Sequence, residues 1–443
     1  MAKIAPLSGF PEWLPAGRIV EQEVLDTLRQ TFEVYGFSSI ETRAVEPVER
    51  LLAKGETSKE IYLLNRLQDQ QAGMTEAELG LHFDLTVPLS RYVLENAGHL
   101  DFPFRRYQIQ KVWRGERPQD GRFREFIQAD IDVVGQDTLA FHHEIELPLV
   151  MVDALARLPI PRVRIHASNR KVAQGFYEAI GIEDVEETLR VVDKLDKVGP
   201  AVITEMLAEK VGANAQQAEL ALKLASINAT NASFADEVLA LGYRGELLDE
   251  GLDELVRLVE GANELMPGSV IADLKIARGL DYYTGSVYES VMEGHADLGS
   301  VCSGGRYDSL VSDGRRTFPG VGLSIGVSRI LARIIGQHIV EPSRKVPTVV
   351  LVAVNNEDER RHAELTASQL RARGIATEVS PSSAKFGRQI RYADRRGIPY
   401  VWFNTDDGEQ VKDIRSGEQM DADPASWNPP TADLRPQLIR HDQ

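Results

Sequence analysis

Residues 102–135, FPFRRYQIQKVWRGERPQDGRFREFIQADIDVVG, predict two paired strands joined by a polar turn. The turn spans residues 115–121 and contains Pro118, Asp120 and Gly121, which are typical of hairpin connections. Side chains along a strand alternate between two faces. The second strand therefore has one apolar and one polar face, formed by Ile127, Ala129, Ile131 and Val133 and by Arg124, Gln128, Asp130 and Asp132. On the first strand, Arg106, Gln108, Gln110 and Arg114 share a face.

The polar face of this hairpin has two interpretations. It is either the solvated side of an ordinary antiparallel hairpin or a ligand site. Glutamine and aspartate beside arginines suit a ligand with phosphate at one end and a cation or amide at the other. The hairpin is also locally basic, and we expect any polyphosphate to bind near Arg105, Arg106, Lys111, Arg114, Arg117, Arg122 and Arg124.

The segments around the hairpin predict an α+β protein. Residues 18–35 have the apolar spacing of an amphipathic helix that ends at Gly36, and residues 38–42 predict a short strand. From residue 172 to 266 the composition shifts to Ala, Leu, Glu and Lys at helical spacing, which indicates a helical insertion. The strand-like pattern returns at Ser269. We therefore expect a core made of residues 1–171 and 267–336, interrupted by the insertion.

The C-terminal part predicts a separate α/β domain. Residues 337–347 have the composition of a linker, and TVVLVAV after it is a continuous apolar strand of the kind buried in a parallel sheet. Helices ending at Gly374 and Gly397 alternate with the strands ATEVS and YVWFN. We expect a βαβαβ domain over residues 348–443, with an irregular tail in about the last 20 residues.

Composition limits the classes of protein that this chain can belong to. The 443 residues carry 50 Lys and Arg against 67 Asp and Glu, a net charge of −17, so a polyanion would need a local basic patch. The single cysteine, Cys302, excludes an intramolecular disulfide and a zinc site made of cysteines. No signal-peptide pattern and no apolar run of roughly 20 residues is present, so we expect a cytoplasmic protein.

Three further segments carry candidate site residues, each with an alternative. HFDLTVPLSRYV places Asp84 and Thr86 on one side of a predicted short strand, where they could hold an ammonium group, although Asp84 could equally cap a turn. IARGLDYYTGSVYE contains Arg278, Asp281, Tyr282 and Tyr283, which alternatively form an ordinary tyrosine-rich strand. SGGRYDSL supplies Gly304 and Gly305, which let backbone approach a ligand closely.

Other residues with reactive side chains have simpler interpretations. Cys302 is expected to be a small buried hydrophobic residue, and His142 and His143 are expected at the surface. FPGVGLSIGVSRILARIIG predicts a strand, a glycine and a helix with Arg329 in its first turn, a position that suits a bound phosphate. No phosphate-binding loop of the GxxxxGK[ST] or GxGxxG kind is present.

Together these segments resemble class II aminoacyl-tRNA synthetases, and the histidyl-tRNA synthetase family in particular. Residues 18–47 resemble the dimer-forming motif 1, the hairpin resembles motif 2, and residues 320–335 resemble motif 3. ARGLDYYTG and SGGRYDSL resemble the two histidine-specific signatures of the family. The resemblance covers nearly the whole chain, and residues 348–443 resemble the anticodon-binding domain. It implies the class II fold, in which the core is an antiparallel sheet flanked by helices.

The resemblance implies ATP-dependent activation of histidine and its transfer to histidine tRNA by a homodimer, with Mg²⁺ accompanying ATP and no metal held by clusters of protein side chains. Arg114 and Arg278 would be the catalytic residues, with Arg278 replacing a metal ion at the α-phosphate. Histidine would be bound by Asp84, Leu85, Thr86, Arg114, Gln128, Asp132, Arg278, Tyr282 and Tyr283. ATP would be bound by Arg114, Glu116, Arg122, Phe126 and Arg329.

Two further features stand apart from these assignments. Ser328 stands where motif 3 commonly has glutamate, so we expect one ATP contact of the family to differ here. The basic stripe Lys385, Arg388, Arg391 and Arg395 follows helical spacing and could contact tRNA or form a solvated face.

Two non-catalytic proteins are alternatives. One is the synthetase-like regulatory subunit of histidine biosynthesis, which generally lacks the anticodon-binding domain and the arginine equivalent to Arg278. The other is a histidine-sensing domain of a regulatory kinase, in which Arg114 or Arg278 would be lost. This chain retains both arginines.

Overall fold

The computed structural model describes residues 5–52, 60–68, 77–276, 282–405 and 408–441. The chain forms two compact units. The first comprises Met1–Pro11 and Leu25–Arg333, and the second comprises Glu12–Val24 and Ile334–Gln443. Each unit is described by itself. No helix among the described residues is long and apolar enough to cross a membrane.

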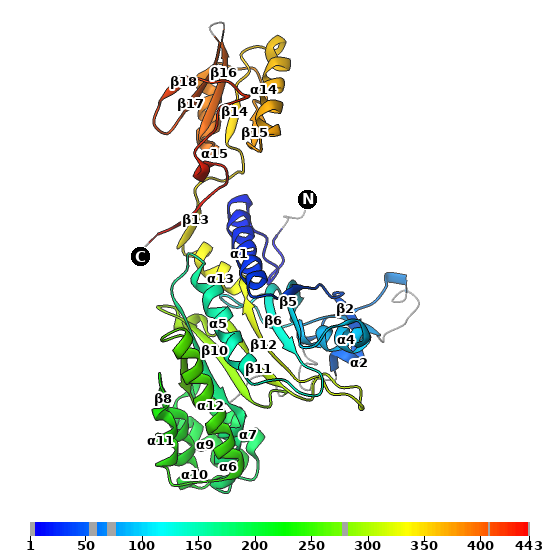
Figure 1. Ribbon diagram of the computed structural model, residues 1–443, viewed down its shortest axis with the longest axis vertical. Coiled ribbons are helices and arrows are strands. Elements are labelled where there is room, and N and C mark those ends of the chain that lie inside the picture. The colour runs from blue at the N-terminus through cyan, green and yellow to red at the C-terminus, as the bar shows by residue number, and fades with distance from the viewer. Residues whose placement is uncertain (1–4, 53–59, 69–76, 277–281, 406–407, 442–443) are drawn as a thin grey trace. The chain divides into compact units, whose positions relative to one another are not determined.

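The first unit is built on a nine-stranded sheet with the order β1-β5-β6-β12-β11-β10-β7-β9-β8 (Figure 1). From β5 to β7 every neighbouring pair is antiparallel, while β1–β5 and β7–β9 are parallel. This arrangement confirms the predicted antiparallel core. The strands are β1 (Ser38–Ser39), β5 (Phe104–Trp113), β6 (Glu125–Val134), β7 (Val163–Asn169), β8 (Asn228–Ala229), β9 (Val270–Asp273), β10 (Ser286–Met292), β11 (Cys302–Tyr307) and β12 (Gly320–Gly326).

The predicted hairpin is the pair β5–β6, which runs in continuous register from Phe104 opposite Val134 to Trp113 opposite Glu125. Gly121 closes the turn with φ of 68°, a left-handed conformation that suits glycine. The hairpin's apolar face is buried, and so is most of its polar face: Arg106, Gln108, Gln128, Asp130 and Asp132 are all buried. The interpretation of this polar face as a solvated surface is therefore wrong.

Two helices, α5 (His142–Ala156) and α12 (Glu246–Leu265), pack against the sheet (Figure 1). The Tyr288 hydroxyl on β10 donates to the backbone oxygen of Glu144 on α5, at 2.7 Å. Directly paired strand residues share a face, so Ser303, Ser324 and Asp130 line up in register on one face of the sheet.

The predicted helical insertion is largely helical in the structure. It also contributes a strand, because β8 pairs with β9 at the edge of the large sheet. The predicted start at residue 172 falls inside α6, and the domain boundary stays a prediction. The helices are α6 (Arg170–Ala179), α7 (Val185–Val192), α8 (Leu195–Val198), α9 (Pro200–Val211), α10 (Ala215–Ser226), α11 (Ser233–Leu239) and α12.

A small three-stranded sheet, β2-β4-β3, lies beside α2 and α4 in the first unit (Figure 1). The prediction of a strand through Asp84 and Thr86 is wrong, since α4 begins at Thr86. The elements here are β2 (Val45–Pro47), β3 (Leu63–Leu64), β4 (Leu79–Leu81), α2 (Val48–Leu52), α4 (Thr86–Asn96) and the short η2 (Ala97–His99). Another short helix, η3 (Ala296–Leu298), lies between β10 and β11 in the sequence.

Two helices contain positions in the sequence at which one unit ends and the other begins. They are α1 (Pro15–Val34) and α13 (Val327–Gly336). Gly36 follows α1 with φ of 77°, as expected for the residue that ends a helix.

The second unit contains a five-stranded sheet with the order β15-β14-β16-β17-β18. Strands β14, β15 and β16 are parallel and alternate with α14 and α15, which matches the predicted βαβαβ domain. The hairpin of β17 and β18 adds an antiparallel edge that the sequence pattern did not indicate. The elements are β14 (Val350–Val352), η4 (Glu357–Glu359), α14 (Arg360–Ala372), β15 (Thr377–Val379), α15 (Phe386–Arg396), β16 (Tyr400–Thr405), β17 (Gly408–Asp413) and β18 (Gln419–Asp421).

The predicted irregular tail is held at several points. Its strand β19 (Leu438–Arg440) pairs with β13 (Val340–Pro342), which lies in the predicted linker. Just before β19, the short helix η5 (Thr431–Asp433) carries Asp433, whose carboxylate forms an ion pair with the Arg415 guanidinium at 2.8 Å. Most of the tail has no regular structure, as predicted, and the structure corrects the prediction at η5 and β19.

Candidate active site

A row of polar side chains crosses the large sheet at its centre. Gln108 on β5, Asp130 on β6, Ser324 on β12 and Ser303 on β11 stand opposite one another in register. Two pockets open along this row, and both are lined by Ser303 and Ser324. The strand order therefore brings residues almost 200 positions apart into one site.

The larger pocket encloses about 620 Å³. It brings together all five residues predicted to bind ATP and also Gln128. It is lined by Arg114, Glu116, Gly121, Arg122, Phe123, Phe126, Gln128, Ser300, Val301, Ser303, Ser324, Gly326 and Arg329. A pocket of this composition suits a nucleotide whose phosphates face the arginines.

Two of the three arginines in the larger pocket donate to backbone oxygens. Arg114 donates through Nε to the Phe83 oxygen at 3.0 Å, and its guanidinium lies 5.1 Å from the centre of the Phe126 ring. Arg329 donates to the Ser300 oxygen at 2.5 Å. Burial, together with the positive charges of Arg122 and Arg114, lowers the pKa of Arg329. Concentrated positive charge that is only partly compensated favours a polyanion.

The smaller pocket lies beside the first and encloses about 230 Å³. It is lined by Thr86, Asp130, Asp132, Tyr282, Tyr283, Ser303, Tyr307, Gly322, Leu323 and Ser324. Four of the residues predicted to bind histidine line it: Thr86, Asp132, Tyr282 and Tyr283. Carboxylates and phenol groups around a small cavity suit a compact cationic or amide-like ligand.

Asp132 is fixed on the wall of this smaller pocket by two partners. Arg106, which is completely buried, forms an ion pair with it at 2.7 Å, and the Tyr307 hydroxyl donates to it at 2.9 Å. A Cβ atom at Gly322 would lie 2.0 Å from Asp132 Oδ1, so only glycine leaves room for the carboxylate. Asp132 is therefore held in one orientation before any ligand arrives.

Asp84 and Leu85 occupy the chain just before α4. The Asp84 carboxylate accepts the Val87 backbone N–H at 3.0 Å, as in the capping interpretation, and it is buried. Leu85 is completely buried. Neither residue is among those that line the smaller pocket, whereas Thr86, the first residue of α4, is.

Gln128 lines the larger pocket rather than the smaller one. Its Nε2 donates to the Ser324 hydroxyl at 2.7 Å, and Ser324 borders both pockets. Gln128 thus lies at the junction between them.

Asp130 lines the smaller pocket but was not among the predicted site residues. The sequence signal was present, because Asp130 stands between Gln128 and Asp132 on the polar face of the strand. Its carboxyl is bonded to Ser324, while Oδ1 has no hydrogen-bond partner among the described residues. Burial raises the pKa of Asp130 to about 7, although Arg106 opposes this shift.

Several other sequence-based predictions have clear outcomes. Cys302 is buried, as predicted, and burial strongly raises the pKa of its thiol. The prediction that His143 is a surface residue is wrong, since it is buried 3.4 Å from Glu146. Gly304 and Gly305 line neither pocket, and a Cβ at Gly305 would lie 2.8 Å from the Tyr283 ring. That glycine leaves room for a tyrosine rather than for a ligand.

Ser328 has a structural contact where the family commonly has glutamate. Its hydroxyl accepts the Ile127 backbone N–H at 2.9 Å, and the side chain is buried. Arg278 and Asp281 lie outside the described residues.

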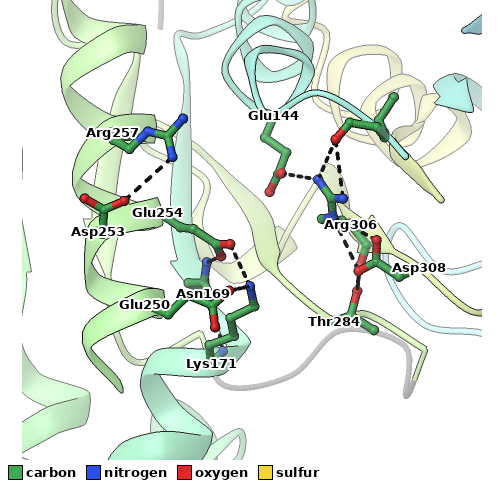
Figure 2. Close-up of polar contacts among 11 residues, drawn as sticks. Glu144, Asn169, Lys171, Glu250, Asp253, Glu254, Arg257, Thr284, Arg306 and Asp308 are labelled. Carbon is green, nitrogen blue, oxygen red and sulfur yellow. Dashed lines mark hydrogen bonds and ion pairs between the residues drawn. The ribbon is translucent and has the colours of Figure 1, made fainter. Parts of the chain in front are cut away.

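A polar network supports the segment that carries Tyr282 and Tyr283. Figure 2 shows Arg306 of β11 between Glu144 on one side and Asp308 on the other. The Arg306 guanidinium lies 2.7 Å from the buried Glu144 carboxylate. Thr284, the residue after Tyr283, donates its backbone N–H to the Arg306 oxygen at 2.8 Å and its hydroxyl to Asp308. Arg306 thereby ties this segment to helix α5.

In the second unit, the predicted basic stripe lies on and just before α15. Lys385, Arg388, Arg391 and Arg395 are all exposed, while Gln389 and Ala393 on the same helix are buried. The stripe is therefore a solvent-facing surface.

Comparison with known proteins gives the family. The sequence model of histidyl-tRNA synthetases matches residues 9–330, almost three quarters of the chain. This chain belongs to the histidyl-tRNA synthetase family. The anticodon-binding domain model matches residues 348–422.

Full-length relatives agree with this assignment. The histidine–tRNA ligase of Cutibacterium acnes is 54% identical and that of Micrococcus luteus 56% identical, each alignment covering 99% of both chains. The crystal structure of histidyl-tRNA synthetase from Nostoc sp. PCC 7120 has a TM-score of 0.84 and 34% identity, covering 95% of this chain and 97% of that one. The class II fold expected for this synthetase family is thus confirmed.

Proposed function

We propose that this chain is a histidine–tRNA ligase, which activates L-histidine with ATP and transfers it to the 3′ end of histidine tRNA. The observation that supports this proposal best is the pair of adjoining pockets, one lined by three arginines and the other by carboxylates and tyrosines. Full-length relatives at 54% and 56% identity carry the same name.

In the activation step, ATP occupies the larger pocket, with its phosphates near Arg114, Arg122 and Arg329 and its adenine on Phe126. The histidine carboxylate must approach the α-phosphate, and these two anions repel each other. Fixed guanidiniums offset this repulsion without reorganising, and each well-placed donor is typically worth roughly 3–4 kcal/mol in the transition state. The family resemblance assigns Arg278 to the α-phosphate in the same way.

Histidine occupies the smaller pocket, with its imidazole near Asp132, Tyr282 and Tyr283. Since Asp132 is fixed by Arg106 and Tyr307, it is already oriented when the ligand arrives. An apolar analogue could not make the polar contacts that this pocket offers to an imidazole, which lowers its rate of activation by about 10⁴-fold or more. Asp84 and Thr86 complete the proposed histidine site from the start of α4.

Magnesium is proposed to enter with ATP. Among the described residues, no group of three or more His, Cys, Asp or Glu side chains could hold a metal ion. Glu116 is the carboxylate that lines the larger pocket. Magnesium normally keeps several waters and binds substrate phosphates with only one or two carboxylates, which this pocket allows. It would supply positive charge to the β- and γ-phosphates as pyrophosphate leaves.

We further propose that the protein works as a homodimer in the cytoplasm. Apolar side chains are exposed on and beside the small sheet β2-β4-β3, and they are Leu52, Leu63, Leu64, Leu67 and Leu79. A cluster of exposed leucines is typical of a surface that another chain covers. The preceding part of the chain, residues 18–47, resembles motif 1, which forms the dimer in this class.

The decisive experiment is ATP–pyrophosphate exchange with each of the twenty amino acids, with magnesium and without tRNA. We expect exchange with histidine alone. Histidine binding without exchange would favour a regulatory protein instead. The retained Arg114 and the matched anticodon-binding domain argue against that alternative.

A further inference from the structure

Arg333 on α13 is a buried arginine outside both pockets, and its contacts join two segments that are far apart in the chain. Its side chain is only 5% exposed. The Arg333 Nη2 atom lies 3.1 Å from Asp120 Oδ2, in the hairpin turn, and 2.7 Å from Asp297 Oδ2, in η3. Its Nη1 atom also donates to Asp297 Oδ1 at 3.3 Å and lies 3.2 Å from His295 Nδ1. One guanidinium therefore holds the turn and η3 together.

These two segments provide neighbouring walls of the larger pocket. The turn, residues 115–121, contributes Glu116 and Gly121, and the residues just after η3 contribute Ser300 and Val301. The turn also packs directly on η3, since a Cβ atom at Gly121 would lie 2.7 Å from Leu298 Cδ1. The relative position of the turn and η3 therefore sets the shape of this pocket.

Arg329, which lies one helical turn before Arg333, has a different role. Its guanidinium lines the larger pocket, and its Nε donates to the Gly121 oxygen at 3.4 Å. Residues four apart on a helix share a face, so the two arginines contact two consecutive residues of the turn. Because Arg333 and Asp120 line neither pocket, a bound nucleotide does not compete for the contact between them.

The charges at this contact make the arginine necessary. The side chains of Asp120 and Asp297 are 76% and 67% exposed, and both carboxylates approach the same Nη2 atom of Arg333. Hydrogen bonding to Arg333 lowers the pKa of Asp297, so this carboxylate is ionised at neutral pH. Without the guanidinium, two carboxylates would face each other and repel the turn from η3.

We propose that Arg333 is a positioning residue that holds the hairpin turn against η3 and thereby preorganises the larger pocket for ATP. This inference rests on the proposed function, which places ATP in that pocket, and it names a residue that controls ATP binding without touching ATP. A wall that is already in place lowers the ordering cost of binding. The smaller pocket shares no residue with the two segments that Arg333 holds, so histidine binding does not depend on this contact.

The test measures ATP binding by calorimetry, with magnesium and without histidine. Michaelis constants for ATP and histidine come from ATP–pyrophosphate exchange. The variants are Arg333→Leu, Asp120→Asn and the two combined, and Arg333→Lys keeps the positive charge. The matched control is Arg157→Leu, which removes an exposed ion pair with Asp153 of α5, outside both pockets.

We expect Arg333→Leu to raise the dissociation constant of ATP roughly 10-fold, because two ion pairs are lost together. The Michaelis constant for histidine should change by less than about twofold. Asp120→Asn alone should weaken ATP binding about two- to fivefold, the range for one exposed pair. It should cause no further loss when combined with Arg333→Leu, since its partner is then already absent. Arg333→Lys should restore part of the ATP affinity, and the control should bind ATP as wild type does.

Three results would overturn this inference. ATP affinity could be unchanged in Arg333→Leu. The constants for ATP and histidine could rise equally, which would make the role of Arg333 purely structural. The losses could add in the combined variant, which would mean that Asp120 acts without Arg333.

Failure of the proposed function gives a different result, because the wild type would then show no exchange with histidine. The calorimetric comparison of the variants would still decide the role of Arg333. A wild type that binds no ATP would overturn both proposals.

Discussion

At the scale of single residues, Asp130 and Asp132 show how neighbours on one strand face can have different environments. Asp132 is compensated by a completely buried arginine and a tyrosine hydroxyl. Asp130 keeps one oxygen without a hydrogen-bond partner among the described residues. The difference comes from β5 and β11, because Arg106 and Tyr307 reach Asp132.

Asp132→Asn is expected to raise the Michaelis constant for histidine by 10-fold or more and also to destabilise the protein. Arg106 cannot lose its proton, and breaking a buried ion pair typically costs roughly 3–5 kcal/mol. Steady-state kinetics and thermal unfolding measure the two effects. The exposed Asp101→Asn serves as the control. An unchanged Michaelis constant would remove Asp132 from the histidine site.

Asp130 should make stability depend on pH. Its folded-state pKa, raised to about 7 from the ordinary 3.8, means that the folded protein binds more protons than the unfolded chain between these values. The free energy of unfolding therefore falls as pH rises through this window. Asp130→Asn removes this contribution, so its melting temperature should exceed that of wild type by more at pH 8 than at pH 5.

This comparison of variants is necessary because Glu289 also has a pKa raised to about 7 by burial and nearby carboxylates. Glu289 is present in both proteins, so its contribution cancels. A constant difference in melting temperature between pH 5 and 8 would contradict the assignment of this pKa to Asp130.

At the scale of elements, the segment containing Tyr282 and Tyr283 depends on contacts with its neighbours. Arg306 of β11 holds both Glu144 of α5 and the residues around Thr284 (Figure 2). We expect Arg306→Ala to raise the Michaelis constant for histidine more than that for ATP. It should also cost stability near the lower end of the roughly 3–5 kcal/mol for a buried pair, because Arg306 is partly exposed.

Figure 2 also provides a matched control for this experiment. Lys171 bridges Glu250 and Glu254 in a second polar network, and none of these residues lines either active-site pocket. Lys171→Ala should leave the Michaelis constant for histidine unchanged, while Arg306→Lys should restore part of the loss. Equal effects of Lys171→Ala and Arg306→Ala on histidine would show that Arg306 acts only through overall stability.

The basic stripe on α15 has its own prediction. Arg388→Ala combined with Arg391→Ala should raise the Michaelis constant for tRNA several-fold and weaken its salt dependence, since phosphate contacts are lost. ATP–pyrophosphate exchange should not change. Arg361→Ala, an exposed arginine on α14, is the control. Unchanged aminoacylation kinetics would make the stripe an ordinary solvated face.

At the scale of the whole molecule, the leucine cluster on the small sheet predicts how chains assemble. Leu64 and Leu79 stand opposite each other on β3 and β4, and both are exposed. Leu64→Glu combined with Leu79→Glu should shift the protein from dimer toward monomer, because charges would be buried in the interface. Light scattering measures the mass, against 49.2 kDa for a single chain.

The control for this prediction is Leu365→Glu, which changes an exposed leucine on α14. A wild-type protein with the mass of one chain would contradict the proposed dimer. A double variant that stays dimeric would place the interface elsewhere.

The sequence alone predicted the features that depend on local pattern. Period-two alternation identified the strands of the hairpin, and glycines marked the ends of helices, as at Gly36 and Gly397, where φ is 77° and 75°. Apolar runs identified the parallel strands of the second unit. These predictions succeeded because such signals arise from neighbouring residues. Family motifs then supplied the candidate site residues, of which six line the larger pocket and four line the smaller one.

Only the tertiary structure decided which interpretation of an ambiguous pattern holds. The hairpin's polar face is buried inside a nine-stranded sheet, and no signal within the hairpin reveals partners such as β12, which come from far along the chain. Asp84 does not lie on a strand; its carboxylate accepts the Val87 backbone N–H in the first turn of α4, which begins at Thr86. The tail is ordered because β13 pairs with it across about a hundred residues. Asp130 became a site residue only when Ser324, far away in sequence, was placed beside it, since long-range strand order is set by the packing of the whole sheet.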